Sequence, residues 1–182
     1  MGTLKTIGSG EIQVAIERLA AAIAARHPQR SKLLLLGVAN GGIELARRLG
    51  AALGAPAGTL DISFHRDDIG RHPIPKEFAP TRIPSDVHGA TVILVDDVLF
   101  SGRTVKAALD EIFDHGRPTK VELAILVDRG GHRLPFAPDY CGFALATKES
   151  EKIFVTLDAA DPRRDSVRIA PAPQSVLAKS PA

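Results

Sequence analysis

The stretch from Val92 to Thr104 constrains the fold of this chain more than any other part of the sequence. Its first four residues, Val92 to Val95, are apolar and β-prone, and two adjacent carboxylates, Asp96 and Asp97, follow directly. An unbroken apolar run is typical of a strand that is buried on both faces of a parallel sheet. Ligands of such sheets bind at the carboxyl ends of the strands. The stretch therefore predicts a buried parallel strand with a binding site at its end.

Beyond the two carboxylates, a small polar turn of Ser101, Gly102, Arg103 and Thr104 opens an amphipathic helical pattern. Free backbone N–H groups and the helix dipole at such a turn favour a phosphate. The carboxylates before it can accept hydrogen bonds from sugar hydroxyls. An acid pair beside an anion-binding turn therefore predicts a site for a sugar phosphate.

Other interpretations of this stretch make different predictions. An ATP-binding P-loop would need a glycine five residues before Gly102, and Asp97 occupies that position, so the P-loop interpretation fails. Adjacent Asp residues at a strand end can also bind Mg²⁺ directly. The simplest alternative is a buried strand that ends in a solvated acidic turn. The order of strand, acid pair, turn and helix favours a binding site over that alternative.

A second stretch repeats the succession of strand, glycine-rich turn and helix. The stretch Lys32–Leu36, a candidate for a short buried strand, leads into the turn Gly37–Gly42 and then into the helical pattern Ile43–Leu53. Backbone N–H groups at this turn would face a second anion. The glycine spacing differs from the dinucleotide-binding fingerprint, which disfavours a dinucleotide site. Taken alone, the turn is equally consistent with a plain tight connection.

Hydrophobic periodicity across the chain predicts an α/β fold with a mostly parallel central sheet flanked by helices. Residues 1–160 are expected to form one domain, and residues 161–182 a partly disordered C-terminal tail. A segment rich in charge, Gly and Pro, from about residue 66 to 89, is expected to be a flexible loop. The expected helices are Ser9–His27, Ile43–Leu53 and Arg103–His115, and the other expected strands are Gly58–Arg66, Val121–Val127, Asp139–Phe143 and Lys152–Leu157.

Composition limits the classes of function. Lys and Arg exceed Asp and Glu by only 23 to 21, which argues against a generally basic nucleic-acid-binding surface. The lone Cys141 cannot form an internal disulfide, so a reducing compartment is favoured. The sequence lacks an apolar stretch of about 18 residues, and its first residues lack a secretory signal pattern. We therefore expect a cytoplasmic protein with no membrane span.

The stretch Val92–Thr104 resembles the motif for 5-phosphoribosyl-1-pyrophosphate (PRPP) in type I phosphoribosyltransferases. That motif has four apolar residues, two acids, two apolar residues and a small polar loop that ends in Thr or Ser. Phe100 stands where many purine enzymes place an acid, and its surroundings resemble the pyrimidine operon regulator/uracil phosphoribosyltransferase family, PyrR. The run Leu126–Gly130 followed by Leu134-Pro135 strengthens this resemblance, which covers roughly residues 9–158.

The resemblance implies a type I phosphoribosyltransferase fold with a small hood and a flexible loop. It also implies the reaction, in which the phosphoribosyl group of PRPP is transferred to uracil to give UMP and pyrophosphate, with Mg²⁺ as cofactor. By this resemblance Asp96 and Asp97 are the catalytic acids that hold the ribose. The 5′-phosphate would be bound by Ser101, Gly102, Arg103 and Thr104.

The remaining site residues also follow from the resemblance. The pyrophosphate would be bound by Ala39, Asn40, Gly41 and Gly42, together with Arg66 from the flexible loop. Many relatives place Lys or Arg in this turn, so its neutrality here makes backbone amides and Mg²⁺ the expected partners. Mg²⁺ would be held mainly by PRPP, with Asp96 as its candidate protein ligand. Asp128 and Arg129 are candidates for the edge of the base.

Three functions remain open at this point: a uracil phosphoribosyltransferase, a UMP-responsive RNA-binding regulator of pyrimidine genes, and a phosphoribosyltransferase for another base. The near balance of charge and the dispersed basic pairs, Arg47-Arg48 and Arg163-Arg164, rank RNA binding below catalysis. His132-Arg133 also departs from the Arg and Glu that relatives place there. The resemblance implies a homodimer or a higher homo-oligomer.

Overall fold

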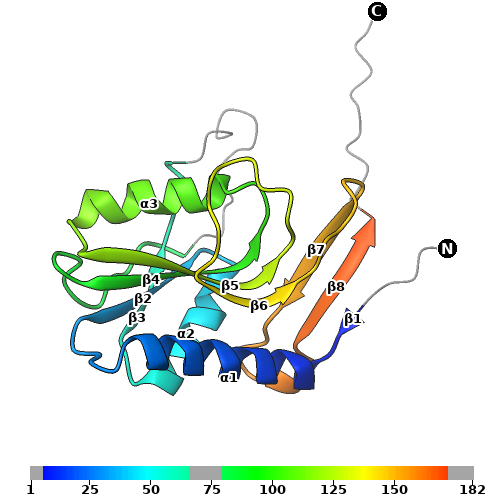
Figure 1. Cartoon of the computed structure of the whole chain (residues 1–182), viewed down its shortest axis with the longest axis horizontal. Coiled ribbons are helices and arrows are strands. Elements are labelled where there is room, and N and C mark those ends of the chain that lie inside the picture. Colours follow the sequence, from blue (N-terminus) through cyan, green and yellow to red (C-terminus); the bar gives the residue numbers. More distant parts are fainter. Residues whose placement is uncertain (1–5, 66–78, 172–182) are drawn as a thin grey trace, which may run out of the picture.

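The computed structural model describes residues 6–65 and 79–171. Its centre is a five-stranded parallel sheet in the order β3-β2-β4-β5-β6 (Figure 1). The strand β4 occupies the middle of this sheet, and the side chains of Val92–Val95 are buried on both faces, as their apolar run predicts. The strands are β2 (Leu33–Val38), β3 (Ala57–Leu60), β4 (Thr91–Leu99), β5 (Lys120–Asp128) and β6 (Tyr140–Ala144).

Helices cover both faces of the central sheet. On one face lie α1 (Ser9–Arg26) and α2 (Gly42–Leu53), and on the other lies α3 (Arg103–His115) (Figure 1). Each helix buries one stripe of aliphatic side chains against the sheet, so the core has two separate layers. This arrangement confirms the predicted α/β class. None of the helices in the described part of the chain is long and apolar enough to cross a membrane.

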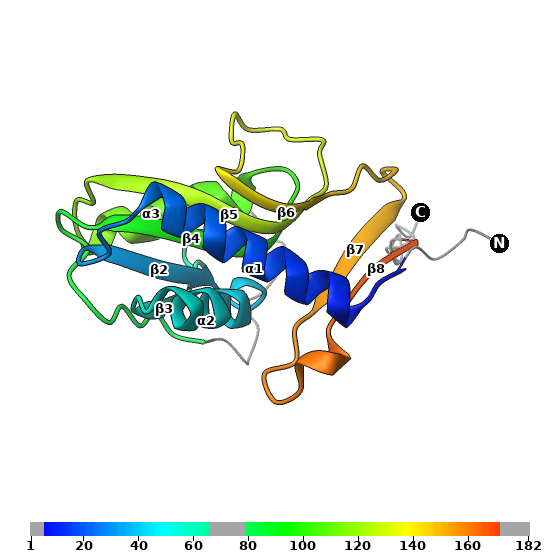
Figure 2. The same cartoon turned by 60° about the horizontal axis from the view of Figure 1, so that its bottom comes forward.

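A second, three-stranded antiparallel sheet forms a hood beyond the central sheet (Figure 2). Its order is β1-β8-β7, from the segments Thr6–Ile7, Ser166–Pro171 and Glu151–Thr156. The expected tail therefore began too early, because the described chain continues in a 3₁₀ turn (η1, Pro162–Arg164) and in β8. Val167 is buried in the core, and Asp165 pairs with Arg48 of α2, which fixes this segment to the domain. Residues 172–182 of that tail lie outside the described residues.

The strand expected over Gly58–Arg66 is shorter than its alternating pattern predicts. It ends at Leu60, and Phe64 is 75% exposed instead of facing the core. The Asp61 carboxylate accepts hydrogen bonds from the backbone N–H and the hydroxyl of Ser63, a local turn that replaces the sheet pairing.

Part of the expected flexible loop is fixed to the edge of the sheet. Thr59 of β3 and Arg82 exchange two backbone hydrogen bonds of 2.9 Å. The expectation of a flexible segment is therefore wrong for this stretch, because β3 offers an unpaired edge that the chain fills. Residues 66–78 of the expected loop lie outside the described residues.

Candidate active site

The acid pair lies at the carboxyl end of the central strand, as its position in the sequence predicts. Asp96 is 6% exposed and Asp97 is half-buried. The Asp96 carboxylate accepts a hydrogen bond of 2.9 Å from the backbone N–H of Asp97. Both side chains line one polar cavity of about 600 Å³. The pair therefore presents buried oxygen acceptors to a space large enough for a small ligand.

Burial sets the electrostatics of the pair. It raises the pKa of the Asp96 carboxyl well above its ordinary value, and the neighbouring Asp97 carboxylate raises that pKa further. Burial also raises the pKa of Asp97, whereas its hydrogen bond with Asp96 and the nearby charge of Lys152 lower it. Two ionised carboxylates are thus costly in this cavity until a positive charge enters it. A metal ion or a sugar carbon that gains positive charge would be stabilised there.

The turn after the acid pair closes another side of the cavity. Ser101, Arg103 and Thr104 line it, and the helix α3 begins at Arg103. The backbone N–H of Arg103 donates to the Ser101 hydroxyl over 3.3 Å. The N-terminal turn of α3 therefore faces the cavity with the partial positive charge that favours a phosphate.

Gly102 is placed differently from its neighbours in this turn. Its φ of 86° lies in the left-handed region that favours glycine. A Cβ at this position would lie 2.9 Å from the Phe136 ring and 3.1 Å from the Leu134 Cβ atom. The residue does not line the cavity. Its role in the turn is to let the loop after β5 pack closely against it.

The glycine-rich turn after β2 lines the same cavity as the turn Ser101–Thr104. Ala39, Asn40 and Gly41 line the cavity, and the peptide bond between Ala39 and Asn40 is cis. Gly42 instead packs under β4, where an added Cβ would lie 2.1 Å from the Val95 carbonyl oxygen. The first turn of α2 can approach β4 closely only because this residue lacks a side chain. Arg66, expected near this turn, lies outside the described residues.

Besides Val38 and Val98 on the strands themselves, two cavity residues from outside β2, β4 and the turns after them are not predicted from the sequence. Lys152 reaches the cavity from β7 of the hood, and Ile62 reaches it from the turn after β3. Lys152 also lies over the Phe154 ring, 5.5 Å from its centroid. The alternation in β7 places Lys152 on the opposite face from the buried Ile153, but it cannot show which surface that face meets. The turn after β2 carries no charged side chain among the residues that line the cavity, and Lys152 adds a positive charge to that lining.

The two candidates for the base lie beside the cavity and do not line it. The Asp128 carboxylate accepts one hydrogen bond of 2.8 Å from the Gly130 backbone N–H and pairs over the same distance with the His132 imidazole. Arg129 donates to Thr147 and lies over the Phe100 ring at 3.9 Å from its centroid. These contacts form a second, smaller recess of about 100 Å³ that is lined by Phe100, Arg129 and Thr147.

The loop that carries these base candidates is joined by hydrogen bonds to the end of β4 and the turn before α3. The backbone N–H of Arg129 donates to the Leu99 carbonyl, and those of Arg133 and Leu134 donate to the Ser101 carbonyl. The distances are 2.9, 3.1 and 3.0 Å. The two loops therefore hold each other in place, so the recess beside Phe100 has a fixed position relative to the cavity.

Comparisons with known proteins agree with this architecture. Residues 7–157 match the family model described as the phosphoribosyl transferase domain. Among solved structures, the hypoxanthine phosphoribosyltransferase of Trypanosoma cruzi aligns with a TM-score of 0.63 and 21% identity, covering 91% of this chain and 95% of that chain. The purine phosphoribosyltransferase of Pyrococcus horikoshii aligns with a TM-score of 0.57 and 24% identity, covering 76% and 85%. These two likenesses show the fold, and the family match shows a phosphoribosyltransferase.

Curated relatives narrow the class further. A Roseiflexus protein named bifunctional protein PyrR is 42% identical to this chain, over 93% of this chain and 96% of the relative. The protein of the same name from Streptomyces coelicolor is 44% identical, over 90% of this chain and 87% of the relative. The chain belongs to the PyrR family of phosphoribosyltransferases. The resemblance seen in the sequence is thereby confirmed.

Proposed function

We propose that this protein transfers the phosphoribosyl group of PRPP to uracil, forming UMP and pyrophosphate. The observation that carries the proposal is one cavity in which the acid pair of β4, the N-terminal turn of α3 and the turn after β2 meet. A sugar that bears a phosphate at one end and a pyrophosphate at the other needs three such groups in this arrangement. Family membership supports the choice of reaction.

The acid pair is assigned to the ribose. The carboxylates of Asp96 and Asp97 accept hydrogen bonds from the 2′ and 3′ hydroxyls and stabilise the positive charge that C1 gains as pyrophosphate leaves. Burial raises the pKa of both carboxyl groups, so a nearby positive charge would stabilise their ionised forms, which supports this assignment. Ser101, Arg103 and Thr104 receive the 5′-phosphate at the start of α3, and Gly102 shapes that turn.

The pyrophosphate is assigned to the side of the cavity between β2 and the hood. Backbone groups of Ala39, Asn40 and Gly41 surround it, and Lys152 supplies the positive charge that the turn itself lacks. Hard carboxylate oxygens at this edge fit Mg²⁺, which proteins hold with one or two carboxylates and the substrate's phosphates. When bound, Mg²⁺ neutralises pyrophosphate charge, and Asp96 is the protein carboxylate placed to contact it.

The base is assigned to the side of the cavity that adjoins Phe100. Asp128 and Arg129 begin the loop there, a carboxylate can accept from an imide N–H, and a guanidinium can donate to a carbonyl. Phe100 stands where many purine enzymes place an acid, so no dedicated general base is expected at that position. The presence of Phe100 at this position favours a pyrimidine base over a purine base as the substrate.

A panel of bases tests the proposal directly. The protein is incubated with PRPP, Mg²⁺ and uracil, cytosine, hypoxanthine or guanine in turn, and the nucleotides formed are separated and quantified. We expect UMP to form fastest, and omission of Mg²⁺ to suppress it. If another base were converted faster, that base would take the place of uracil as the proposed substrate. If no base gave a nucleotide, the proposed catalysis would be contradicted.

Regulation through RNA is the second candidate function, because the relatives are named bifunctional. The basic pairs that the sequence offers for it are compensated within the fold. Arg47 and Arg48 both pair with Glu44, and Arg48 also pairs with Asp165. Arg163 and Arg164 pair with Asp161 in the turn η1. RNA binding therefore ranks below catalysis in the proposal.

A further inference from the structure

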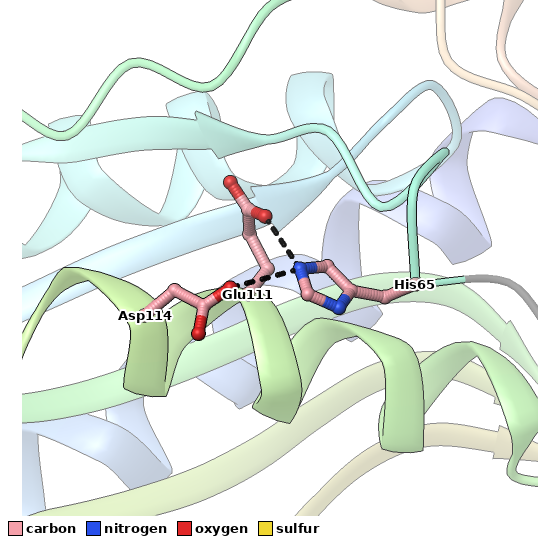
Figure 3. Close-up of side chains that lie close together, drawn as sticks. All are labelled: His65, Glu111 and Asp114. Carbon is pink, nitrogen blue, oxygen red and sulfur yellow. Dashed lines mark ion pairs between the residues drawn. The ribbon is translucent and has the colours of Figure 1, made fainter.

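A cluster of potential metal ligands lies apart from the cavity, between α3 and the turn after β3. His65, in the turn after β3, points between Glu111 and Asp114, which lie one turn apart on α3 (Figure 3). The His65 Nε2 atom lies 3.1 Å from Glu111 Oε2 and 3.2 Å from Asp114 Oδ2. None of the three residues lines the cavity assigned to the substrate.

The spacing of these three atoms suits a bound ion. All three lie within 4.8 Å of one another. Bonds of about 2.0–2.2 Å to nitrogen and oxygen in a tetrahedral site place neighbouring ligand atoms roughly 3.3 Å apart. Both distances from the imidazole nitrogen are close to that value. The single proton on Nε2 can make a well-aligned hydrogen bond with only one of the two carboxylates, whereas a bound ion would contact all three ligand atoms.

The Glu111 carboxylate is already oriented for this role. Its Oε1 atom accepts a hydrogen bond of 2.6 Å from the Thr81 hydroxyl and lies 3.1 Å from the His115 Nε2 atom. Its Oε2 atom is thereby directed toward His65. Outer contacts of this kind fix the orientation of ligating carboxylates in metal sites. The chain on both sides of residues 66–78 contributes, because His65 precedes that segment and Thr81 follows it.

Exposure leaves an entry path for an ion and for water. The side chains of His65 and Glu111 are 23% and 14% exposed, whereas that of Asp114 is 69% exposed. An ion held by the three residues would keep its remaining positions toward solvent. A site with two well-packed ligands and one exposed ligand matches a three-ligand centre completed by water.

We propose that His65, Glu111 and Asp114 bind one divalent transition-metal ion, of which Zn²⁺ is the representative. The imidazole selects this class over Mg²⁺ and Ca²⁺, which prefer oxygen ligands alone. The ion would join the turn after β3 to α3 and so fix one side of the chain that borders the substrate cavity. This inference is independent of the base that the protein uses.

Titration of the metal-free full-length protein with Zn²⁺, in competition with a chromogenic chelator, tests the proposal. The informative variants are His65→Gln and Asp114→Asn. Their matched controls are His88→Gln, an exposed histidine elsewhere, and Asp110→Asn, an acid on α3 that pairs with Lys106. Asp97→Asn controls for binding at the acid pair of the cavity. Far-UV circular dichroism verifies that each variant is folded.

We expect one Zn²⁺ per chain in the wild type and in all three controls, with affinity at least about tenfold weaker in His65→Gln and Asp114→Asn. Bound Co²⁺ should show the visible absorption of a low-coordinate centre in the wild type, and this signal should be lost in His65→Gln. Excess Zn²⁺ should raise Tm in the wild type and not in that variant. The proposal would be overturned if the wild type bound no Zn²⁺, or if His65→Gln and Asp114→Asn bound it with unchanged affinity. It would also be overturned if only Asp97→Asn lost Zn²⁺ binding.

Discussion

At the scale of single residues, the acid pair of β4 is placed for chemistry at some expense of stability. Burial raises the pKa of Asp96 well above its ordinary value and also raises that of Asp97. A carboxyl group whose pKa is raised on folding binds its proton more tightly in the native state, so it destabilises the fold at neutral pH. The pair therefore costs stability at neutral pH, which supports its assignment to the substrate under the proposed function.

Replacement of Asp97 by Asn separates these two effects. We expect turnover of uracil to fall on the order of 10²–10³-fold, because an amide cannot stabilise positive charge at C1 as a carboxylate does. We also expect Tm to be equal to or higher than that of the wild type, since the variant removes one of two adjacent buried charges. Steady-state rates and thermal melting provide the measurement. Near-normal turnover would remove Asp97 from the site.

Gly102 illustrates a residue whose importance is structural within the site. We expect Gly102→Val to lose most affinity for UMP, because the added side chain would strain a φ of 86° and displace Phe136 and Leu134. Gly54→Val is the matched control, with a φ of 62° and nothing within 4 Å of its Cβ position. Both variants should lose on the order of 1–2 kcal/mol of stability to backbone strain. Calorimetry with UMP should distinguish them, and equal affinity in both would contradict this role.

The sequence predicts which side chains lie together at the carboxyl ends of the central strands. It does not predict which residues of the hood complete the cavity. Asp96, Asp97 and the turn Ala39–Gly41 line one cavity because β2 and β4 are adjacent parallel strands whose carboxyl ends meet at one edge. Lys152 enters from a different sheet, so its position depends on how the hood is placed. Local periodicity carries no information about that placement.

At the scale of elements, the hood supplies charge that the turn after β2 lacks. We expect Lys152→Met to raise the KM for PRPP about tenfold, the usual order for loss of a hydrogen bond to a charged group, with a smaller change in kcat. Lys148→Met, on the connection before β7, is the control and should leave KM unchanged. Initial rates over a range of PRPP concentrations give both constants. An unchanged KM in Lys152→Met would assign the pyrophosphate to other groups.

A buried carboxylate joins α1 to the central sheet at the end opposite the cavity. The Glu122 side chain of β5 is fully buried. Its carboxylate accepts hydrogen bonds from the Lys120 ammonium at 2.5 Å and from the Tyr140 hydroxyl at 2.6 Å. It also pairs with the His27 imidazole at 2.7 Å. Burial alone would raise its pKa, but these three partners outweigh burial and lower the pKa to about 2. The ionised form is therefore the stabilising form.

The sign of this shift gives a pH dependence of stability. The contribution of a carboxylate with a lowered pKa is complete above its ordinary value of 4.5 and is lost as pH falls toward 2. We expect Glu122→Gln to be less stable than the wild type by roughly 3–5 kcal/mol at pH 7. That difference should narrow between pH 4.5 and 2. Urea unfolding across this range measures it, and a constant difference would mean that the charge does not stabilise the fold.

The hood also shows why the end of the domain is hard to predict. The segment Ser166–Pro171 lies in a stretch rich in Pro, Ala, Ser and Arg, a composition typical of tails. Its two large apolar residues, Val167 and Ile169, are too few to predict a strand. Pairing with β1 and β7 stabilises it, and those partners come from opposite ends of the chain. Composition describes a segment, whereas burial depends on its neighbours.

At the scale of the whole molecule, charge distribution bears on whether the protein binds RNA as well as catalysing phosphoribosyl transfer. Net charge is only +2. The basic pairs Arg47-Arg48 and Arg163-Arg164 each face carboxylates of the same chain. Each contact with an RNA phosphate needs a cation that is available to it, and the number of such contacts sets both affinity and salt dependence. Few exposed aromatic side chains are present in the described ranges to stack on unpaired bases.

We therefore expect measurable uracil phosphoribosyl transfer together with weak RNA retention at near-physiological salt. Filter binding with the leader RNA of the organism's own pyrimidine genes, with and without UMP, measures retention, and the base assay on the same preparation measures turnover. An RNA of matched length and shuffled sequence is the control for charge-driven binding. A second copy of the chain could add cations to a shared face, so the oligomeric state is recorded at the same protein concentrations. Tight leader binding that UMP modulates, with negligible uracil turnover, would reverse the order of the two functions.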